Sequence, residues 1–388
     1  MLDFRTTEAH GRSVFAKMDI PAGTHLLTEK PYLSMPLPES RASVVACERC
    51  CKPLGTMAMQ AAHLAGDGHE VELPLADDDE SVLADDVPCK TKCGARYCSR
   101  SCQEADAPAH AMLCRGTSKV AAAAIKKFES HAMETEELFL FAARFVVHAI
   151  ASGTQSLSPF AALCRVPFWD LSDEGMDKTE EEKEEVRYEC NTSRRLLLSV
   201  LSATASVRAS SWLTLEAYGG LLGAIRRNAI LVELSHPLRD LLPVLSEWRQ
   251  VQPASSAEGK AVGAMLDALP RPLPECLWSA VYPRISCVNH SCRPSCEVQW
   301  FDESHEGTLV ATRNIRKGEE LYISYIPENV QADSVHARRA SLRDYGFECD
   351  CDKCTTEAAW QRRLRPRLTF THECMGPGCT VGCCEPCE

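Results

Sequence analysis

The spacing of cysteines constrains this chain more than any other feature of its sequence. The 388 residues include 22 cysteines, and three of these, Cys349, Cys351 and Cys354, lie close together. Cysteines at such short spacing cannot easily form disulfides with one another, but they can surround a tetrahedral metal ion. The alternative is three buried thiols in a small core, which the short spacing makes the weaker interpretation.

A second series of candidate ligands lies nearer the start of the sequence. It comprises Cys47, Cys50, Cys89, Cys93, Cys98, Cys102, His110 and Cys114. His110 and Cys114 are one helical turn apart, so both can face one ion from the same side of a helix. Cys51 is an alternative ligand to Cys50. Because this stretch has little apolar sequence of its own, metal binding would supply its folding free energy.

Composition narrows the environment in which the chain works. The length suits two or three domains, and the hydrophobic fraction of 45% is ordinary for a globular protein. The first residues hold no apolar signal-peptide core, so we expect reduced cysteines and a location in the cytoplasm and nucleus. The longest apolar stretch, residues 138–151, contains Arg144 and His148 and is too short for a bilayer. We therefore expect no membrane partner.

Two motifs in the second half of the chain carry the strongest functional signal. Residues 289–294 read Asn-His-Ser-Cys-Arg-Pro, residues 318–321 read Gly-Glu-Glu-Leu, and Tyr325 follows. In this order, with the cysteine cluster after them, they resemble the signature of SET-domain protein methyltransferases. The resemblance implies a knot-like crossing that forms a pocket for S-adenosylmethionine and a narrow channel for a lysine side chain. It also implies one structural zinc ion bound by Cys292, Cys349, Cys351 and Cys354.

The earlier ligand series resembles a MYND zinc finger, in which eight ligands bind two zinc ions in interleaved order. The resemblance assigns one ion to Cys47, Cys50, Cys98 and Cys102, and the other to Cys89, Cys93, His110 and Cys114. A SET domain split by such a finger is the layout of the SMYD family of protein-lysine methyltransferases. The chain resembles the short subgroup of that family, represented by the fifth member, which lacks a helical, TPR-like C-terminal domain.

The resemblance implies an α+β fold: a β-rich SET domain with a knot-like crossing, split by the finger and a helical insertion. The expected order is SET N-terminal part (1–46), MYND finger (47–114), helical insertion (115–250), core SET domain (251–330), zinc-binding post-SET segment (331–354) and cysteine-containing tail (355–388). The tail holds Cys374, Cys379, Cys383, Cys384 and Cys387. A further metal site there stays open, but frequent Gly and Pro favour a flexible tail.

Local patterns predict individual elements. Apolar residues at three- and four-residue spacing predict helix over residues 120–149, and the acidic run at residues 180–185 predicts a helix start. Short apolar runs predict strands over residues 282–285, 296–301, 308–312 and 320–326. Frequent Pro, Ser and Gly predict a loop over residues 248–260.

The family resemblance also assigns roles to single residues. It implies contacts to S-adenosylmethionine by Gly11, Arg12, Asn228, Asn289, His290, Tyr325 and Phe347. It makes Tyr345 a wall of the lysine channel and Tyr325 the catalytic residue, whose hydroxyl orients the amine. Three alternatives stay open: Asn228 caps a turn, His290 is a general base, or Tyr325 only packs in its strand.

The expected function is S-adenosylmethionine-dependent methylation of lysines in histones or other proteins, by a monomer with three structural zinc ions. The net charge of −12 is compatible with a basic substrate and argues against nucleic-acid binding, although a solvated acidic surface explains it equally well. The rival function is an adaptor or transcriptional co-regulator, with an inactive SET scaffold and a finger that binds proline-rich peptides. A zinc hydrolase does not fit, because neither ligand set leaves an open coordination position.

Overall fold

The computed structural model describes residues 1–66, 73, 82–153, 163, 166–172, 176–204, 211–251, 256–301 and 304–364. Helices and short strands are mixed along the chain, which confirms the α+β class. The five cysteines of the C-terminal tail and the acidic run at residues 77–80 lie outside the described residues.

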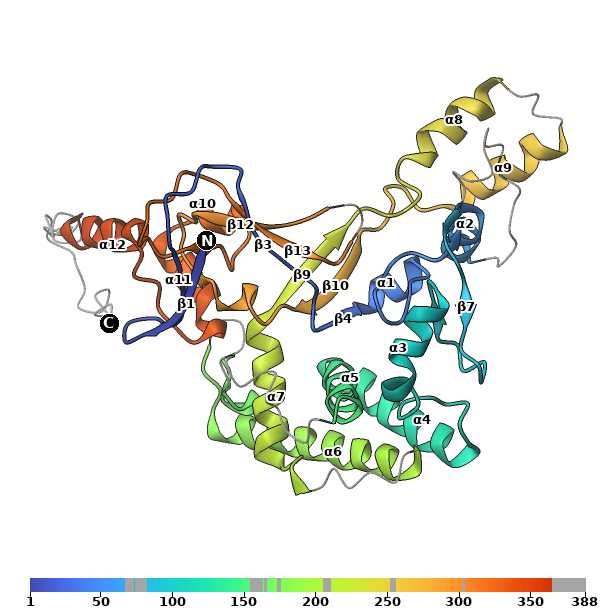
Figure 1. Cartoon of the computed structure of the whole chain (residues 1–388), viewed down its shortest axis with the longest axis horizontal. Helices are drawn as coiled ribbons and strands as arrows, with labels where there is room; N and C mark the ends of the chain where they lie inside the picture. Colours follow the sequence, from blue (N-terminus) through green and yellow to red (C-terminus); the bar gives the residue numbers. More distant parts are fainter. Residues whose placement is uncertain are drawn as a thin grey trace, which may run out of the picture.

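Short strands from both ends of the chain form the β-rich part of the molecule (Figure 1). They are β1 (Leu2–Thr7), β2 (Gly11–Ala16), β3 (His25–Glu29), β4 (Leu33–Pro36), β9 (Ala229–Leu234), β10 (Cys276–Val281), β11 (Asn289–His290), β12 (Cys296–Trp300), β13 (Gly307–Ala311) and β14 (Tyr322–Ile323). β1 and β2 form a hairpin, β10 lies between β4 and β9, and β13 lies between β12 and β3. β11 pairs in parallel with β14, with Asn289 opposite Tyr322. This pairing brings the two sequence motifs side by side.

One apolar core holds strands that are far apart in the sequence. Val14 of β2 and Leu27 of β3 are buried together with Trp278 of β10, Leu309 of β13 and Leu321. Burial of large apolar side chains is the main favourable contribution to folding here, at roughly 1.5–3 kcal/mol for each one. Apolar packing therefore holds the first strands of the chain against the last ones, and this packing does not need a metal ion.

A helical layer lies below the sheets (Figure 1). It contains α4 (Lys119–Glu134), α5 (Leu138–Ala151), the 3-10 helix η3 (Phe168–Asp170), α6 (Glu180–Thr204) and α7 (Leu215–Asn228). α5 is apolar on nearly all sides and is buried among the other helices, which explains its composition. Gly223 is required where η3 approaches α7, because a Cβ there would lie 1.8 Å from the carbonyl oxygen of Val166. In the described part of the chain, no helix is long and apolar enough to cross a membrane.

The finger region is built from small elements. These are α1 (Pro38–Ser43), β5 (Gly55–Thr56), α2 (Met57–Ala65), β6 (Val82–Ala84), β7 (Val87–Pro88), β8 (Arg96–Tyr97) and α3 (Arg100–His110). Its fully buried residues are mostly candidate ligands, and Leu54 and Tyr97 are the large side chains among them. α2 packs instead with α8 (Leu241–Val251) and α9 (Ala257–Ala268), in an arm that extends away from the sheets (Figure 1).

The post-SET segment is a run of short helices at the other end of the molecule (Figure 1). It consists of α10 (Glu328–Ala332), α11 (Val335–Leu342), the 3-10 helix η6 (Arg343–Tyr345) and α12 (Asp352–Leu364). Val335 and Leu342 of α11 share a small core with Ile326, Cys292 and the nearby cysteines.

Four local predictions were wrong in whole or in part. The strand predicted over residues 320–326 is limited to β14. Residues 229–234, expected to be helical, form β9, because they pair along the whole of β10. The strand predicted over residues 282–285 is absent from the described structure: β10 ends at Val281, and Pro283 cannot supply the amide that a continued strand needs. The loop predicted over residues 248–260 falls partly in α8 and α9, where Ser256 caps α9 by accepting a hydrogen bond from the amide of Gly259. The strands over residues 296–301 and 308–312 are confirmed as β12 and β13.

Candidate active site

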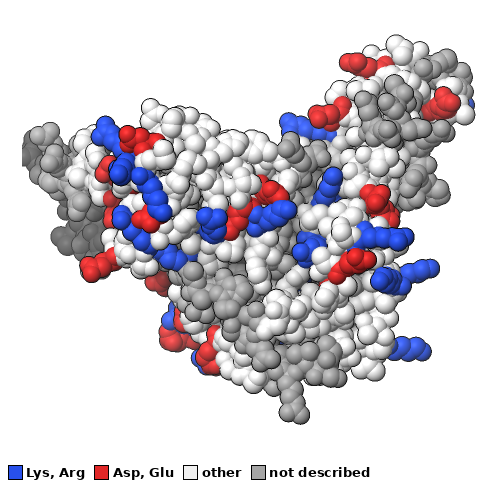
Figure 2. All heavy atoms as spheres, viewed as in Figure 1, with Lys and Arg blue, Asp and Glu red and all other residues white. Residues whose placement is uncertain are grey.

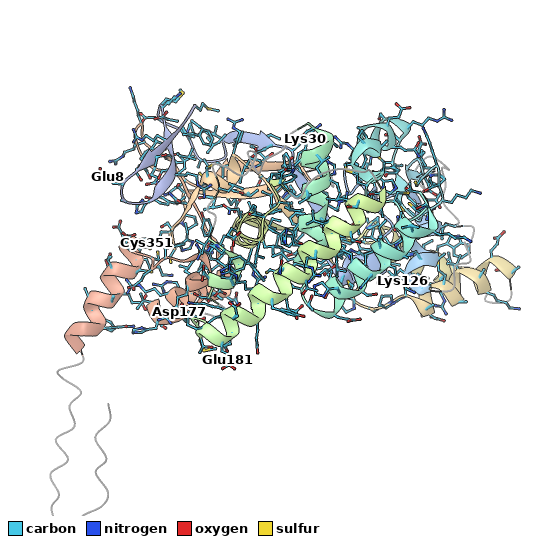
Figure 3. All side chains as sticks on the ribbon, turned by 90° about the horizontal axis from the view of Figure 1, so that it is seen from below. Glu8, Lys30, Lys126, Asp177, Glu181 and Cys351 are labelled. Carbon is cyan, nitrogen blue, oxygen red and sulfur yellow. The ribbon has the colours of Figure 1, made fainter. Side chains whose placement is uncertain are left out.

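A cavity of about 790 Å³ lies between the β1–β2 turn, the end of α7, the β11–β14 pair and the post-SET segment. The predicted site residues that line it are Arg12, Asn228, Asn289, His290, Tyr325, Tyr345 and Phe347. Gly11 is not among the lining residues, although its neighbours on both sides are. Figure 3 shows the β1–β2 turn, marked by Glu8, and Cys351 at the same end of the molecule. Five separate parts of the sequence thus meet around one cavity.

The side chain of Asn289 connects three of these segments through hydrogen bonds. Its amide nitrogen lies 2.8 Å from the carbonyl oxygen of Arg12, 3.0 Å from Ser13 Oγ and 2.9 Å from Glu320 Oε1. Glu320 in turn accepts a hydrogen bond from the hydroxyl of Tyr322 at 2.8 Å. Burial alone would raise the pKa of Glu320, but these hydrogen bonds outweigh it and keep the pKa below its usual value. The carboxylate is therefore the charged centre of a network beneath the cavity.

His290 links a cysteine ligand to the backbone of Tyr325. The Nδ1 atom accepts a hydrogen bond from the amide of Tyr325 at 3.0 Å, so the proton sits on Nε2, which lies 3.3 Å from Cys292 Sγ. Burial lowers the pKa of His290 to about 4, so the ring is neutral near pH 7. Both ring nitrogens are engaged within the protein. This arrangement favours a positioning role over the general base that the sequence left open.

Tyr325 lies among aromatic side chains. Its ring centroid is 4.9 Å from that of Tyr345, 5.5 Å from that of His290 and 6.3 Å from that of Phe347. Its hydroxyl donates to the carbonyl oxygen of Val288 at 2.7 Å. The single hydroxyl proton is therefore committed, and the oxygen faces other partners as an acceptor. Phe347, an apolar ring with 37% of its surface exposed, adds an apolar wall to the cavity.

The end of α7 connects the helical layer to this cavity. The side-chain amide of Asn228 donates to the carbonyl oxygen of Ala224, and its Oδ1 atom accepts from Arg12 at 3.4 Å. Asn228, the last residue of α7, therefore bonds back to its own helix and lines the cavity at the same time. Gly346, beside the end of α7, has a positive φ, and a Cβ there would lie 2.3 Å from the guanidinium of Arg227. The α7 end and the post-SET turn are thus in close contact.

The twelve predicted metal ligands form three separate groups of four. The groups are Cys47, Cys50, Cys98 and Cys102; Cys89, Cys93, His110 and Cys114; and Cys292, Cys349, Cys351 and Cys354. Within each group, the ligand atoms lie within 4.8 Å of one another. Measured sulfur–sulfur separations of 3.4–4.0 Å bracket the value of about 3.7 Å expected for thiolates around tetrahedral zinc, and they are far too long for a disulfide. The ligand sets therefore fit zinc. Cys51 lies outside them, buried 3.8 Å from the carbonyl oxygen of Ser34.

Comparison with known proteins finds a SET domain and lysine methyltransferase relatives. The family model described as SET domain matches residues 170–326. The chain is 26% identical over 381 residues to the protein-lysine N-trimethyltransferase SMYD5 of Gallus gallus, covering 91% of this chain and 85% of that protein. It is 28% identical over 323 residues to the histone-lysine N-methyltransferase ATXR2 of Arabidopsis thaliana, covering 74% of this chain and 66% of that protein. A 78-residue stretch is 45% identical to the human histone-lysine N-methyltransferase SMYD3, covering 20% of this chain and 17% of that protein.

Together these matches support a SMYD-family protein-lysine methyltransferase. The SET domain and the lysine methyltransferase relatives support an enzyme, a protein-lysine N-methyltransferase. The match over residues 170–326 spans the second half of the helical layer and the core SET strands, up to the residue after Tyr325.

The role of Glu320 was missed at the sequence level. Glu320 stands inside the Gly-Glu-Glu-Leu motif, but no local pattern indicated that its carboxylate would accept hydrogen bonds from Asn289 and Tyr322. Ser295, the residue after Pro294, is fully buried; its hydroxyl accepts from the amide of Tyr322 at 3.0 Å, and its own amide donates to the carbonyl oxygen of Tyr322 at 3.0 Å. These two hydrogen bonds join the two motifs.

Proposed function

We propose that this SMYD-family enzyme transfers a methyl group from S-adenosylmethionine to the side-chain amine of a lysine in a protein substrate, and that both molecules meet in the cavity around Tyr325. The observation that carries the proposal is the convergence of Asn289, His290, Tyr325, Tyr345 and Phe347 on that one cavity from separate parts of the chain.

The cavity suits a cofactor of this kind. Its volume of about 790 Å³ lies within the ordinary range for ligand sites. Phe347 offers an exposed ring for an adenine-like group, and lining side chains of both signs, such as Arg12 and Asp350, suit a molecule that carries both charges. When bound, S-adenosylmethionine supplies an electrophilic methyl group on a positively charged sulfur. Asn289, His290 and Phe347 are the residues we propose to hold it.

Tyr325 orients the attacking amine. A lysine amine attacks only when neutral, yet its ordinary pKa is about 10.4. A channel walled by Tyr345 and Tyr325 removes water from the amine and favours its neutral form. The hydroxyl of Tyr325 donates its proton to Val288, so toward the lysine its oxygen would act as an acceptor for an N–H. That contact would leave the nitrogen lone pair aimed away from Tyr325 and toward the methyl group.

The three cysteine-rich ligand sets support three structural zinc ions in each chain. All four ligands of each set come from the protein, so none of the sites keeps an open position for catalysis. Elemental analysis of purified protein should give three zinc ions per chain. One ion or none would contradict the assignment, and a fourth would point to the tail cysteines.

The proposed substrate is a protein that presents a lysine. The relatives' names refer to histone-lysine and protein-lysine targets, so we propose histone tails or other basic proteins. Figure 2 shows acidic and basic side chains interspersed among the described residues of the drawn face, without one large patch of either sign. Recognition would therefore depend on the edges of the lysine channel more than on overall charge. We further propose that the enzyme acts as a monomer in the cytoplasm and nucleus, and that the finger binds proline-rich peptides.

A radiolabel assay tests the function directly. Purified protein is incubated with tritiated S-adenosylmethionine and a mixture of basic proteins, and calorimetry measures cofactor binding in parallel. We expect label on lysine and measurable cofactor binding. Cofactor binding without transfer would redirect the search to other substrates, whereas no binding by zinc-loaded protein would overturn the proposal.

A further inference from the structure

Arg338 is a fully buried charge in the post-SET segment. It lies on α11, and 0% of its residue surface is exposed, which is rare for an arginine. A guanidinium keeps its proton under all ordinary conditions, so it can be buried only with anionic or strongly accepting partners. The identity of these partners indicates what the residue does.

Two of the partners belong to α12. The Nη2 atom of Arg338 lies 3.4 Å from Cys354 Sγ, a ligand of the post-SET cluster, and 2.9 Å from Glu357 Oε2. The Nη1 atom donates to the carbonyl oxygen of Asp333, immediately before α11. Glu357 also accepts a hydrogen bond from the backbone amide of Val335 at 2.7 Å, which adds a second link between the two helices. Arg338 thus connects α11 to α12 beside the cluster.

The charge of the cluster explains why a cation is placed there. Four thiolates around one divalent zinc ion leave a net negative charge, and Cys292, Cys349 and Cys354 are all buried. Such a charge is costly in a low-dielectric interior unless a partner compensates for it. Hydrogen bonds from charged donors to thiolates also steady a metal site from outside its ligand shell. Among the side chains that the structure describes, Arg338 donates to Cys354 and His290 donates to Cys292, and of these two donors only Arg338 carries a permanent charge.

The same helix leads directly to the cavity. α11 continues into η6, which ends at Tyr345, and Phe347 follows two residues later. The hydroxyl of Tyr345 donates to the carbonyl oxygen of Tyr325 at 3.3 Å. A shift of α11 would therefore change the positions of both tyrosines. Arg338 has no atom in the cavity and does not touch the reacting groups. Its effect on the reaction would be indirect.

We propose that Arg338 is a positioning residue, which retains the post-SET zinc ion by compensating the charge of its thiolates and so holds Tyr345 and Phe347 in the cavity wall. The retention of zinc stands independently of the catalytic activity, whereas the effect on the reaction rests on the proposed function. The matched control is Arg339, the next residue of α11, which contacts Glu348 and the carbonyl oxygen of Cys349 but no sulfur atom.

The test measures zinc release to a coloured chelator from zinc-loaded wild-type protein and from the variants Arg338→Met, Arg338→Lys and Arg339→Met. The two finger ions serve as the internal reference in each sample. We expect one ion of three to leave roughly 10–100-fold faster in Arg338→Met, the usual effect of removing a partner outside a metal's ligand shell. Arg338→Lys keeps the positive charge but loses the planar guanidinium that donates to several partners at once, so its rate of zinc release should be intermediate. Arg339→Met should stay within about 3-fold of wild type, because it removes no hydrogen bond to a ligand sulfur.

Cofactor affinity, measured by calorimetry on the same samples, should fall in the order of the release rates. Unchanged release of all three ions in Arg338→Met would overturn the proposal. Equal acceleration at all three sites in both Arg338 variants would also overturn it, because it would indicate a general packing role. Selective zinc release in Arg338→Met, together with no cofactor binding by zinc-loaded wild-type protein, would uphold Arg338 as the zinc-retaining residue and reject the proposed function.

Discussion

The finger and the post-SET segment are both organised around cysteine ligands, yet they stand in opposite relations to the active-site cavity. None of the eight finger ligands lines the cavity, and Figure 1 shows α3 of the finger at the other end of the molecule from α11 and α12. Cys349 and Cys351 of the post-SET group line it directly, and Cys292 is linked through His290 to the backbone of Tyr325. The same chemistry therefore stabilises a remote module in one place and the wall of a catalytic site in the other.

The two regions also differ in what remains when the metal is lost. Among the described residues of its small core, the finger has Leu54 and Tyr97 as large, fully buried side chains beside its ligands, so we expect its fold to depend on zinc. The SET strands carry a separate apolar core that contains none of the twelve grouped ligands, although Cys51 lies in it. Loss of zinc should thus unfold the finger and loosen the post-SET segment, while the strands of the SET core persist.

The largest effect is expected from breaking one zinc site at a time. Cys351→Ala removes a ligand at the cavity, so Tyr345 and Phe347 lose their support, and methyl transfer should be abolished together with most cofactor affinity. Cys98→Ala removes a finger ligand and should leave cofactor affinity within a few-fold of wild type. Calorimetry with S-adenosylmethionine measures both. The proposed difference between the two regions would be contradicted by near-normal cofactor affinity in Cys351→Ala. Equal losses of cofactor affinity in Cys351→Ala and Cys98→Ala would contradict it too.

The next effect isolates chemistry from support. Tyr325→Phe keeps the ring contacts with Tyr345 and His290 but removes the hydroxyl oxygen that we propose as the acceptor for the amine. If that oxygen acts mainly in the transition state, the rate should fall by at least ~100-fold, the loss typical of one preorganised polar group, while cofactor affinity changes only a few-fold. Single-turnover transfer of labelled methyl provides the rate. Undiminished turnover would remove Tyr325 from the mechanism and leave only its place in the pocket.

Much of this contrast was accessible from the sequence, because ligand spacing is a local pattern with few structural solutions. The division of twelve ligands into three sets follows from the family resemblance, and the structure brings the same sets together. The contacts that tune the site were not accessible in the same way. Glu320 and Asn289 are 31 residues apart, and Arg338 looks like any helix-surface arginine until α12 covers it. Such pairs are specified by tertiary packing, as is β9, which follows a helix without an intervening loop.

Glu320 tests whether the cavity depends on hydrogen bonds as well as on zinc. Glu320→Gln removes the charged carboxylate that accepts hydrogen bonds from Asn289 and Tyr322. We expect the free energy of unfolding at pH 7 to fall by about 1–3 kcal/mol and cofactor affinity to fall about 10-fold. Because the pKa of Glu320 is lowered in the folded protein, its stabilisation is present above its ordinary pKa of about 4.3 and is lost as the pH falls through the lowered value. The difference in unfolding midpoint between wild type and variant should therefore shrink as the pH falls below about 5. Both proteins lose zinc in acid, so the difference at each pH is the quantity to compare. A difference that is constant from pH 7 to acid would show that the carboxylate charge is not the source of the effect.

The smallest effects come from two helix caps, one in each zinc region. Ser99 Oγ accepts the amide of Cys102 at the start of α3, and Ser334 Oγ accepts the amide of Ala337 at the start of α11. Replacement of either serine by alanine should cost about 1 kcal/mol of local stability, because one backbone amide at the helix start loses its acceptor.

The two equal losses of helix stability should have different effects on zinc release and on cofactor binding. Ser99→Ala should speed zinc release from the finger a few-fold and leave cofactor affinity unchanged, since α3 does not reach the cavity. Ser334→Ala should leave the finger ions unchanged and weaken cofactor binding a few-fold, because α11 carries the chain into Tyr345. Chelator kinetics and calorimetry on the pair provide both values. If Ser334→Ala proved silent in cofactor binding while α11 was measurably less stable, the cavity wall would have to be held by the β11–β14 pair and not by the zinc-bound helices.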